Sequence, residues 1–202
     1  MEFHRKGVKL IITVDCGITS FQALDEAGKK GIDVIITDHH EPHKEDGTTR
    51  LPSALCVINP KLTDSPMSIL SGAGVALKLV EALGLPVEDY LDLAALGTLA
   101  DVVPLVGENR VIVKEGLALI KEGRRHGIRA LRAVARIEDK EPKSVMLAYT
   151  LLPRINAAGR IANAGEAVEL LMSGSIETAM PIAEWLDSKN TERQKIEEGV
   201  YK

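Results

Sequence analysis

The sequence predicts an α/β protein. A parallel-sheet domain is expected at its N-terminal part, followed by a mainly helical part and the start of a long connecting helix. Two apolar runs, 9–15 and 33–38, each end on a carboxylate, and an amphipathic segment, 19–31, lies between them. Strand, helix and strand, with both strands apolar throughout, are typical of a βαβ unit in a buried parallel sheet.

The composition indicates a globular protein with an aliphatic core. Aromatic residues make up only 3% of the 202 residues, so the core must consist of Leu, Ile, Val and Ala. A net charge of −4 argues against a chain that coats nucleic acid through bulk charge, although it leaves room for a local basic channel. No apolar run is long enough for a membrane span or a signal peptide. Cys16 and Cys56 are expected to be reduced thiols of a cytoplasmic protein.

Turn and capping residues divide the remaining chain into elements. Segment 54–60 is expected to be a third strand that Pro60 stops, and the loop before it, 41–53, is the most flexible-looking stretch. Apolar spacing predicts helices over 71–84, 88–97, 108–123, 127–138, 142–152, 164–174 and 178–199. We therefore expect an α/β part over 1–106, a helical part over 107–177 and the start of the connecting helix over 178–202.

Polar side chains gather where the first two strands end. Asp15 and Asp38 fall at the carboxyl edge of the predicted sheet, where ligands of parallel α/β proteins bind, and His39 and His40 follow directly. Carboxylate oxygens and imidazole nitrogens together suit a divalent cation such as Mn²⁺ or Mg²⁺. The alternative is that both aspartates cap backbone amides and that both histidines are exposed turn residues.

A third acid, Asp101, stands alone in the apolar segment 96–105. A buried carboxylate is costly unless it is paired, protonated or bound to a metal, so Asp101 is a further candidate ligand. The alternative is a turn cap before Pro104.

Two other segments could contact phosphate. Segment 124–136 carries five arginines and no acid, and Arg129, Arg132 and Arg136 recur at helical spacing. They form either a strip that follows a nucleic-acid backbone or a solvated helix face. Segment 71–76, "SGAGVA", either cradles a phosphate at a helix N-terminus or uses its glycines for close helix packing.

The motifs "TVDCGI", "TDHHEP" and "LGTLADVVPL", in this order, resemble successive motifs of the DHH phosphoesterase superfamily. The segments "LPSALCVINPK", "LSGAGVALKLVEAL", "PRINAAGRIANAGEAVELL" and "NTERQKIE" are similar to the RecJ family within it, whose members are metal-dependent 5′→3′ exonucleases specific for single-stranded DNA. The likeness covers nearly the whole chain. It implies a hydrolase of phosphodiester bonds in DNA repair and recombination. Single-stranded DNA would be its substrate, and single-strand-binding protein or other repair proteins would be partners of the longer relatives.

The resemblance also implies roles for particular residues. Asp15 would bridge two metal ions, Mn²⁺ or Mg²⁺, with His39 and Asp101 as further ligands. His40 would face the scissile phosphate, and Asp38 would orient the site as a partner of a histidine.

The segment "RINAAGR" resembles the phosphate-contacting motif of the family, which assigns that role to Arg154, Asn156 and Arg160.

The sequence departs from the family in one respect. Family members carry an upstream Asp-x-Asp motif that supplies two more metal ligands, and this sequence lacks it. We therefore expect an internal piece of a RecJ-like catalytic core, with an incomplete two-metal site and little or no activity alone. An apolar sheet edge without its neighbouring strand should also make the piece marginally stable or prone to aggregate. The alternatives are a DHH phosphodiesterase for oligoribonucleotides or cyclic dinucleotides, and a non-catalytic nucleic-acid-binding module.

Overall fold

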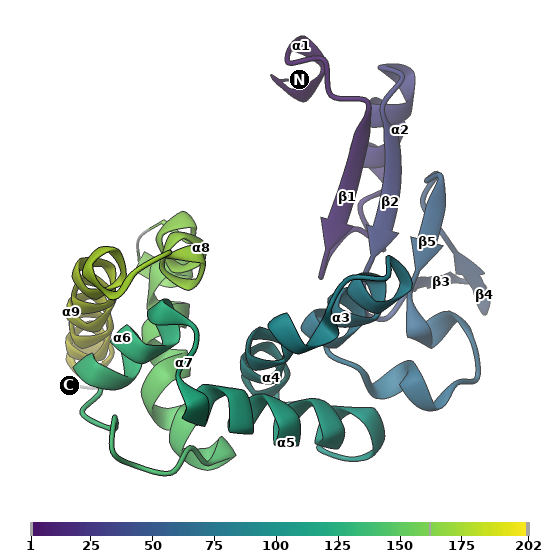
Figure 1. Cartoon of the computed structure of the whole chain (residues 1–202). Helices are drawn as coiled ribbons and strands as arrows, with labels where there is room; N and C mark the ends of the chain where they lie inside the picture. Colours follow the sequence, from purple (N-terminus) through teal and green to yellow (C-terminus); the bar gives the residue numbers. More distant parts are fainter. Residues whose placement is uncertain (1, 162, 201–202) are drawn as a thin grey trace. The chain divides into compact units, whose positions relative to one another are not determined.

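The computed structural model describes residues 2–161 and 163–200 (Figure 1), and the chain divides into two compact units, Met1–Lys114 and Glu115–Lys202. The predicted α/β architecture is confirmed, because a parallel sheet is followed by a series of helices. The division falls inside α5, and the domain boundaries expected after residues 106 and 177 stay predictions.

The helices and strands, in chain order, are α1 (Glu2–Arg5), β1 (Leu10–Val14), α2 (Phe21–Lys29), β2 (Asp33–Thr37), β3 (His43–Glu45), β4 (Thr48–Arg50), β5 (Cys56–Ile58), α3 (Gly72–Ala82), α4 (Leu91–Ala100), α5 (Gly107–Glu122), α6 (His126–Val134), α7 (Ser144–Ile161), α8 (Gly165–Met172) and α9 (Ile176–Val200). Short 3₁₀ turns lie at Pro60–Leu62, Pro66–Ile69 and Val87–Asp89.

The sheet of the first unit has the strand order β1-β2-β5, and all its strands are parallel (Figure 1). The register pairs Val14 with Thr37 and Thr37 with Ile58, so the three strands end at one edge. Helix α2 covers one face, where Leu24 and Ala27 pack with buried residues of β2. This is the βαβ unit that the alternation of apolar strands and an amphipathic segment predicts.

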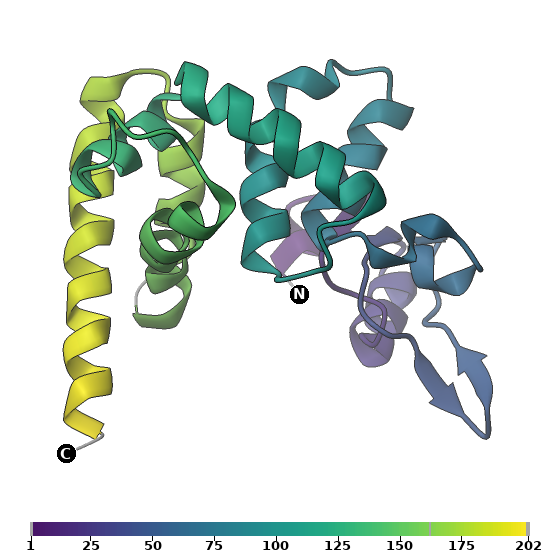
Figure 2. The same ribbon diagram turned by 90° about the horizontal axis from the view of Figure 1, so that it is seen from below.

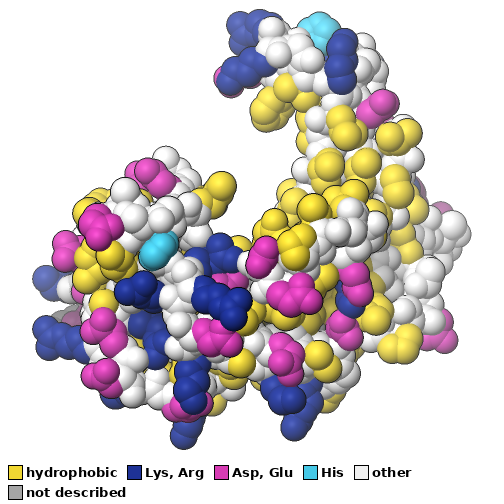
Figure 3. All heavy atoms as spheres, in the orientation of Figure 1, with side chains coloured by type: hydrophobic (Ala, Val, Ile, Leu, Met, Phe, Trp, Pro, Cys, Tyr) yellow, Lys and Arg dark blue, Asp and Glu magenta, His cyan; other side chains and the backbone are white. Residues whose placement is uncertain are grey.

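The opposite face of the sheet is open, which corrects the expectation of a sheet buried on both sides. Leu10, Ile12 and Val14 point to this face and are 46%, 47% and 52% exposed. Ile35 pairs with Ile12 and therefore lies on the same face. Figure 3 shows hydrophobic side chains gathered over these strands. Because β1 pairs with one strand only, its outer edge also lacks a partner strand in the described part of the first unit.

The loop expected over 41–53 contains an antiparallel hairpin of β3 and β4. The chain reverses at Asp46 and Gly47, whose φ angles of 50° and 77° are both in the left-handed region. Two such residues are typical of the type I′ turn that joins hairpin strands, and Asp-Gly is one of its preferred sequences. The dipeptide was therefore a signal for a hairpin that the prediction overlooked.

Helices α3 and α4 pack closely behind the sheet edge. A Cβ atom placed on Gly97 of α4 would lie 2.4 Å from the Cβ of Ala73 in α3, so only glycine allows this approach. Leu70, Val75 and Ala94 belong to the core of this region. The close contact fixes the start of α3, which borders the candidate site described below.

The second unit is helical, with α6, α7 and α8 gathered along α9 (Figures 1 and 2). Helix α7 continues through Pro153 to Ile161, whereas the sequence predicted an end at residue 152. A proline inside a helix frees carbonyl groups of the preceding turn. Arg154, the next residue, donates from Nη1 to the Thr150 carbonyl of this turn at 2.6 Å.

Helix α9 begins at Ile176, earlier than the expected residue 178, because the Ser175 hydroxyl accepts the Thr178 amide and starts the helix there. Its first half is buried through Ala179, Ala183 and Leu186. Of the helices in 2–161 and 163–200, none is both long and apolar enough to cross a membrane.

Candidate metal centre

Asp15 stands directly after β1, at the carboxyl edge of the sheet. Its backbone adopts a left-handed conformation, with φ of 61°, while its amide donates to the Thr37 carbonyl at 3.0 Å. A non-glycine residue with positive φ is uncommon, and aspartate is one of the residues that adopts this conformation most readily. The conformation turns the chain away from the strand and leaves the carboxylate more than half exposed.

His39 is buried and lies between two carboxylates. Its Nε2 is 3.1 Å from Oδ1 of Asp15, and its Nδ1 is 3.1 Å from the Leu70 carbonyl and 3.4 Å from Oδ2 of Asp101. Because a carbonyl oxygen only accepts, the Nδ1–H donates to Leu70, and Nε2 lies on the Asp15 side. This hydrogen bond fixes the ring in the tautomer that can ligate a metal through Nε2.

Asp38 is buried and accepts four hydrogen bonds. Its Oδ2 accepts the Ile18 amide at 2.9 Å, and its Oδ1 accepts the His39 amide at 2.8 Å, the His40 amide at 3.1 Å and the His40 Nδ1–H at 2.7 Å. Burial alone would raise the pKa of this carboxyl, but the hydrogen bonds from Ile18, His40 and His39 outweigh it and hold the pKa below its usual value. Asp38 thus stays charged and orients both histidines rather than facing a ligand.

His40 is exposed, and its ring lies 4.5 Å from that of His39, centroid to centroid. Asn59 donates to the His40 carbonyl at 2.9 Å and so holds the backbone of this turn. One oxygen or nitrogen from each of Asp15, His39 and His40 lies within 4.8 Å of the others. The structure therefore brings His40 into the same cluster as two of the three expected ligands.

Asp101 lies at the end of α4 with its side chain at the surface, which corrects the expectation of a buried acid. The helix ends at Ala100, so Asp101 is its C-cap residue and does not belong to the apolar face of the helix. Val102 follows with φ of 57°. The acid that α4 does bury is Asp92. Asp101 approaches the cluster from the Nδ1 side of His39, opposite Asp15.

The three residues of "RINAAGR" do not share one face of α7. Arg154 is largely buried and donates from Nε and Nη2 to Oδ1 of Asp187 in α9, at 2.8 and 2.7 Å. Asn156 and Arg160 are one helical turn apart and exposed. The structure leaves Asn156 and Arg160 accessible to a phosphate and uses Arg154 to join two helices of the second unit.

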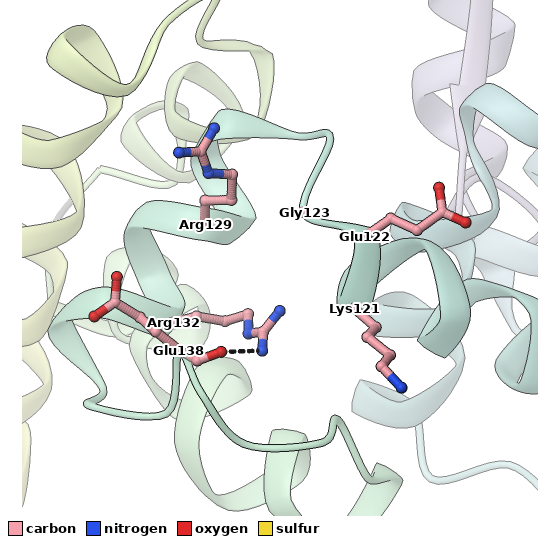
Figure 4. Close-up of a pocket in the computed structure, with 6 residues that line it drawn as sticks. All are labelled: Lys121, Glu122, Gly123, Arg129, Arg132 and Glu138. Atoms are coloured by element: carbon pink, nitrogen blue, oxygen red, sulfur yellow. Dashed lines mark hydrogen bonds between the residues drawn. The ribbon is translucent and has the colours of Figure 1, made fainter.

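The arginines of segment 124–136 do not form a surface strip. Arg132 comes one turn after the buried Ile128 and is itself only 6% exposed. Its guanidinium donates to the carbonyls of Ile120, Ile137, Glu138 and Lys140, at 2.6 to 3.5 Å. Figure 4 shows the bond to Glu138. Arg136 lies beyond the end of α6, with φ of 56°. Only Arg129 remains exposed on the helix, so the expectation of three arginines on one accessible face was wrong.

A pocket of about 260 Å³ lies beside Arg132 and is lined by Lys121, Glu122, Gly123, Arg129, Arg132 and Glu138 (Figure 4). Arg132 caps the C-terminal end of α5 through the Ile120 carbonyl, where the helix dipole is negative. The buried guanidinium therefore has a structural role.

Several groups that shape the site were not anticipated. The Leu70 carbonyl holds His39, and Asn109, which is fully buried, donates to the carbonyls of Ile69 and Pro104 at 2.7 and 3.1 Å. Asn109 therefore joins the segment before Leu70 to the segment after Asp101. Backbone carbonyls leave no trace in a sequence, and a lone Asn near a helix start resembles an ordinary polar residue.

A family model, curated relatives and solved structures agree on the proteins to which this chain is similar. Residues 2–98 match the family "DHH family, N-terminal domain". The chain is 42% identical to "Single-stranded-DNA-specific exonuclease RecJ" of Dickeya dadantii, over 96% of this chain and 36% of that protein. It is 41% identical to the protein of the same name from Thermus thermophilus, over 98% of this chain and 29% of that protein.

Solved structures agree in fold. The "Crystal structure of exonuclease RecJ bound to manganese" superimposes with a TM-score of 0.84 and 41% identity, over 99% of this chain and 52% of that chain. RecJ of Thermus thermophilus in complex with Mn²⁺ superimposes with the same TM-score and 40% identity, over 98% of this chain and 31% of that chain. The chain spans about a third of the length of the curated relatives it matches. Residues 2–98 thus match the N-terminal domain of the DHH family, and the chain is similar to RecJ exonucleases over nearly its whole length.

Proposed function

We propose that this chain carries part of the catalytic core of a divalent-metal-dependent phosphodiesterase that degrades single-stranded DNA in the 5′→3′ direction. The observation that supports it best is the convergence of Asp15, His39 and His40 within 4.8 Å at the carboxyl edge of a parallel sheet. The names of the similar proteins supply the substrate, single-stranded DNA. A cytoplasmic location belongs to the same proposal and is supported by two free thiols, Cys16 and Cys56.

The donor set fits Mn²⁺ or Mg²⁺. Asp15 offers an exposed carboxylate, and His39 offers Nε2 beside it, with the ring held by its hydrogen bond to Leu70. Asp101 lies 3.4 Å from Nδ1, on the other side of the ring, so it would have to turn toward Nε2 to share this cation. Carboxylate favours the hard ions, and imidazole shifts the preference toward Mn²⁺. A bound cation would act as a Lewis acid that neutralises charge on the phosphate.

The remaining residues orient and bind. Asp38 holds His40 so that its Nε2 is free to face a phosphate oxygen, and Asn59 holds the His40 carbonyl. Asn156 and Arg160, both exposed on α7, would bind a phosphate of the substrate. Arg154 supports this segment through Asp187 and does not itself contact the substrate.

Activity of this chain alone should be weak. Three or four protein ligands from the described residues hold one cation loosely, and a two-metal site needs more carboxylates than Asp15 and Asp101 provide. We therefore expect measurable Mn²⁺ binding with little or no cleavage of DNA. Single-strand-binding protein as a partner stays a prediction.

The first test measures Mn²⁺ binding. Electron paramagnetic resonance reports the concentration of the free ion. Asp15→Asn and His39→Gln should each weaken binding by about tenfold or more, since each removes a ligand. Asp25→Asn is the matched control, because Asp25 is an exposed acid of α2 away from the cluster. Equal binding by wild type, Asp15→Asn and His39→Gln would exclude this metal site.

The second test concerns the substrate. End-labelled single-stranded DNA, an oligoribonucleotide and a cyclic dinucleotide are incubated with the protein and Mn²⁺. Trace cleavage of DNA from the 5′ end, lost in Asp15→Asn, would support the proposal, and preference for either of the other substrates would overturn the assignment to DNA. Binding of DNA that is unchanged in Asp15→Asn and never leads to cleavage would favour a non-catalytic module.

A further inference from the structure

The turn at the start of α3 borders all three expected ligands of the candidate metal centre. The Leu70 carbonyl accepts from His39, and the Ile69 carbonyl accepts from Asn109, which also binds the Pro104 carbonyl beyond Asp101. Gly72, the first residue of α3, lies against Asp15. This short segment therefore contacts His39 and Asp15 directly and is joined through Asn109 to the segment after Asp101.

Gly72 makes the closest of these approaches. A Cβ atom placed on it would lie 2.0 Å from Oδ1, 2.3 Å from Cγ and 2.7 Å from Cβ of Asp15. Real Cβ atoms essentially never lie within 3.0 Å of a non-bonded heavy atom, and rotation of the carboxylate alone would not relieve the contact with the Asp15 Cβ. The φ of Gly72 is not in the left-handed region, so its backbone does not require glycine. Space for Asp15 is the reason that remains.

The turn itself has little freedom to retreat. Ser71 is fully buried; its hydroxyl accepts the Gly74 amide at 3.0 Å and lies 2.9 Å from the hydroxyl of Thr98 in α4. Next to it, Ala73 packs against Gly97 at a distance that excludes any added atom. Because α3 is fixed to α4 on this side, a methyl group on Gly72 would have to displace Asp15.

We propose that Gly72 is a positioning residue of the metal centre: its missing side chain is the space that keeps the Asp15 carboxylate beside Nε2 of His39. This inference rests on the proposed function, since it assumes that Asp15 and His39 share a cation. It assigns to the glycine of the "SGAG" segment a steric role toward a ligand, different from phosphate cradling and from helix packing. A methyl group at this position moves Asp15 outward and separates the two ligands.

The experiment compares Gly72→Ala with Gly28→Ala. Gly28 is a helical glycine of α2 with nothing within 4 Å of an added Cβ, so the control changes the same atoms without a collision. Mn²⁺ affinity should fall by about tenfold or more in Gly72→Ala, the effect expected when the support of a metal ligand is lost, and should not change in Gly28→Ala. An unchanged affinity in Gly72→Ala would overturn the inference.

A double-mutant cycle identifies the atoms responsible. Asp15→Gly removes every Asp15 side-chain atom that the methyl group would meet. The loss of thermal stability caused by Gly72→Ala in the wild type should therefore disappear in the Asp15→Gly background. An equal loss in both backgrounds would show that the methyl group meets something else and would refute the proposal. If Gly72→Ala does not fold, recovery of folding in Asp15→Gly/Gly72→Ala supports the proposal, and its absence overturns it.

The outcomes separate this inference from the proposed function. A wild-type chain that binds no Mn²⁺ would overturn both. A wild-type chain that binds Mn²⁺ while Gly72→Ala binds it equally well would overturn only the role of Gly72.

Discussion

Asp15 and Val102 both have a left-handed backbone, and each lies at the metal centre, Asp15 as a candidate ligand and Val102 directly after Asp101. For a β-branched residue such as Val102, this conformation is a genuine outlier. Such strain persists only where the surrounding structure imposes it, and it gathers at functional sites. The left-handed conformation of Val102 comes two residues after the end of α4 and turns the chain toward Pro104.

Replacing Val102 by glycine should raise the free energy of unfolding by about 1 kcal/mol. Relief of roughly 1–3 kcal/mol of strain exceeds the entropic cost of glycine, roughly 0.5–1 kcal/mol. The valine side chain is 85% exposed, so little burial is lost. Urea denaturation measures the change. Val106→Gly is the matched control, since Val106 is exposed and has no positive φ, and it should lose stability. A Val102→Gly protein less stable than the wild type would contradict the strain.

At the level of single residues, the sequence revealed the candidates but not what holds them. Asp15, Asp38 and His39 could be placed together because each follows a strand end in a parallel sheet. Gly72 could not be linked to Asp15, because their contact joins segments far apart in the chain. For Arg132, helical spacing gave the right helix but not which side of that helix is buried.

Among the elements of the first unit, α3 and α5 are joined by Lys78, whose amine pairs with Glu108 of α5 and with Glu81 of its own helix. Partial burial on its own would lower the pKa of Lys78, but the hydrogen bonds to Glu108 and Glu81 outweigh it and raise the pKa above its usual value. A pKa raised by folding means that the charged amine stabilises the folded state.

The raised pKa of Lys78 sets the sign of the pH dependence of stability. The contribution of Lys78 is fully present below the pKa of the unfolded chain, about 10.4, and is lost as the pH rises through the higher pKa of the folded state. Lys78→Met should therefore have a lower melting temperature than the wild type, by a constant difference from neutral pH to about pH 10. Above that pH the difference should shrink. A difference that shrinks on going from pH 9 to pH 7 would contradict this assignment.

Element boundaries were predictable where the local sequence decides them and not where side chains far along the chain do. The βαβ order followed from apolar periodicity. The end of α7 did not, because Arg154, directly after Pro153, is held by Asp187 of α9, which lies far along the chain. The hairpin of β3 and β4 was not predicted for a different reason. Asp46-Gly47 is a local turn signal, but the strands on either side of it are short and polar, so the whole segment resembles a loop.

For the molecule as a whole, the open sheet face has the clearest consequence. Leu10, Ile12 and Val14 form an apolar row on an edge strand, and exposed apolar patches of this kind promote association. The chain should therefore self-associate as its concentration rises, and Ile12→Lys should reduce this association. Sedimentation velocity over a range of concentrations measures it. Val145→Lys, at an exposed valine of α7, is the control. A wild type that stays monomeric at all concentrations would refute the prediction.

The same row also sets how the protein responds to temperature. Attraction between apolar surfaces weakens on cooling, because it is driven by the release of ordered water. Complexes held together through Leu10, Ile12 and Val14 should then loosen in the cold and tighten on warming, so chilled solutions will hold more of the single chain than warm ones.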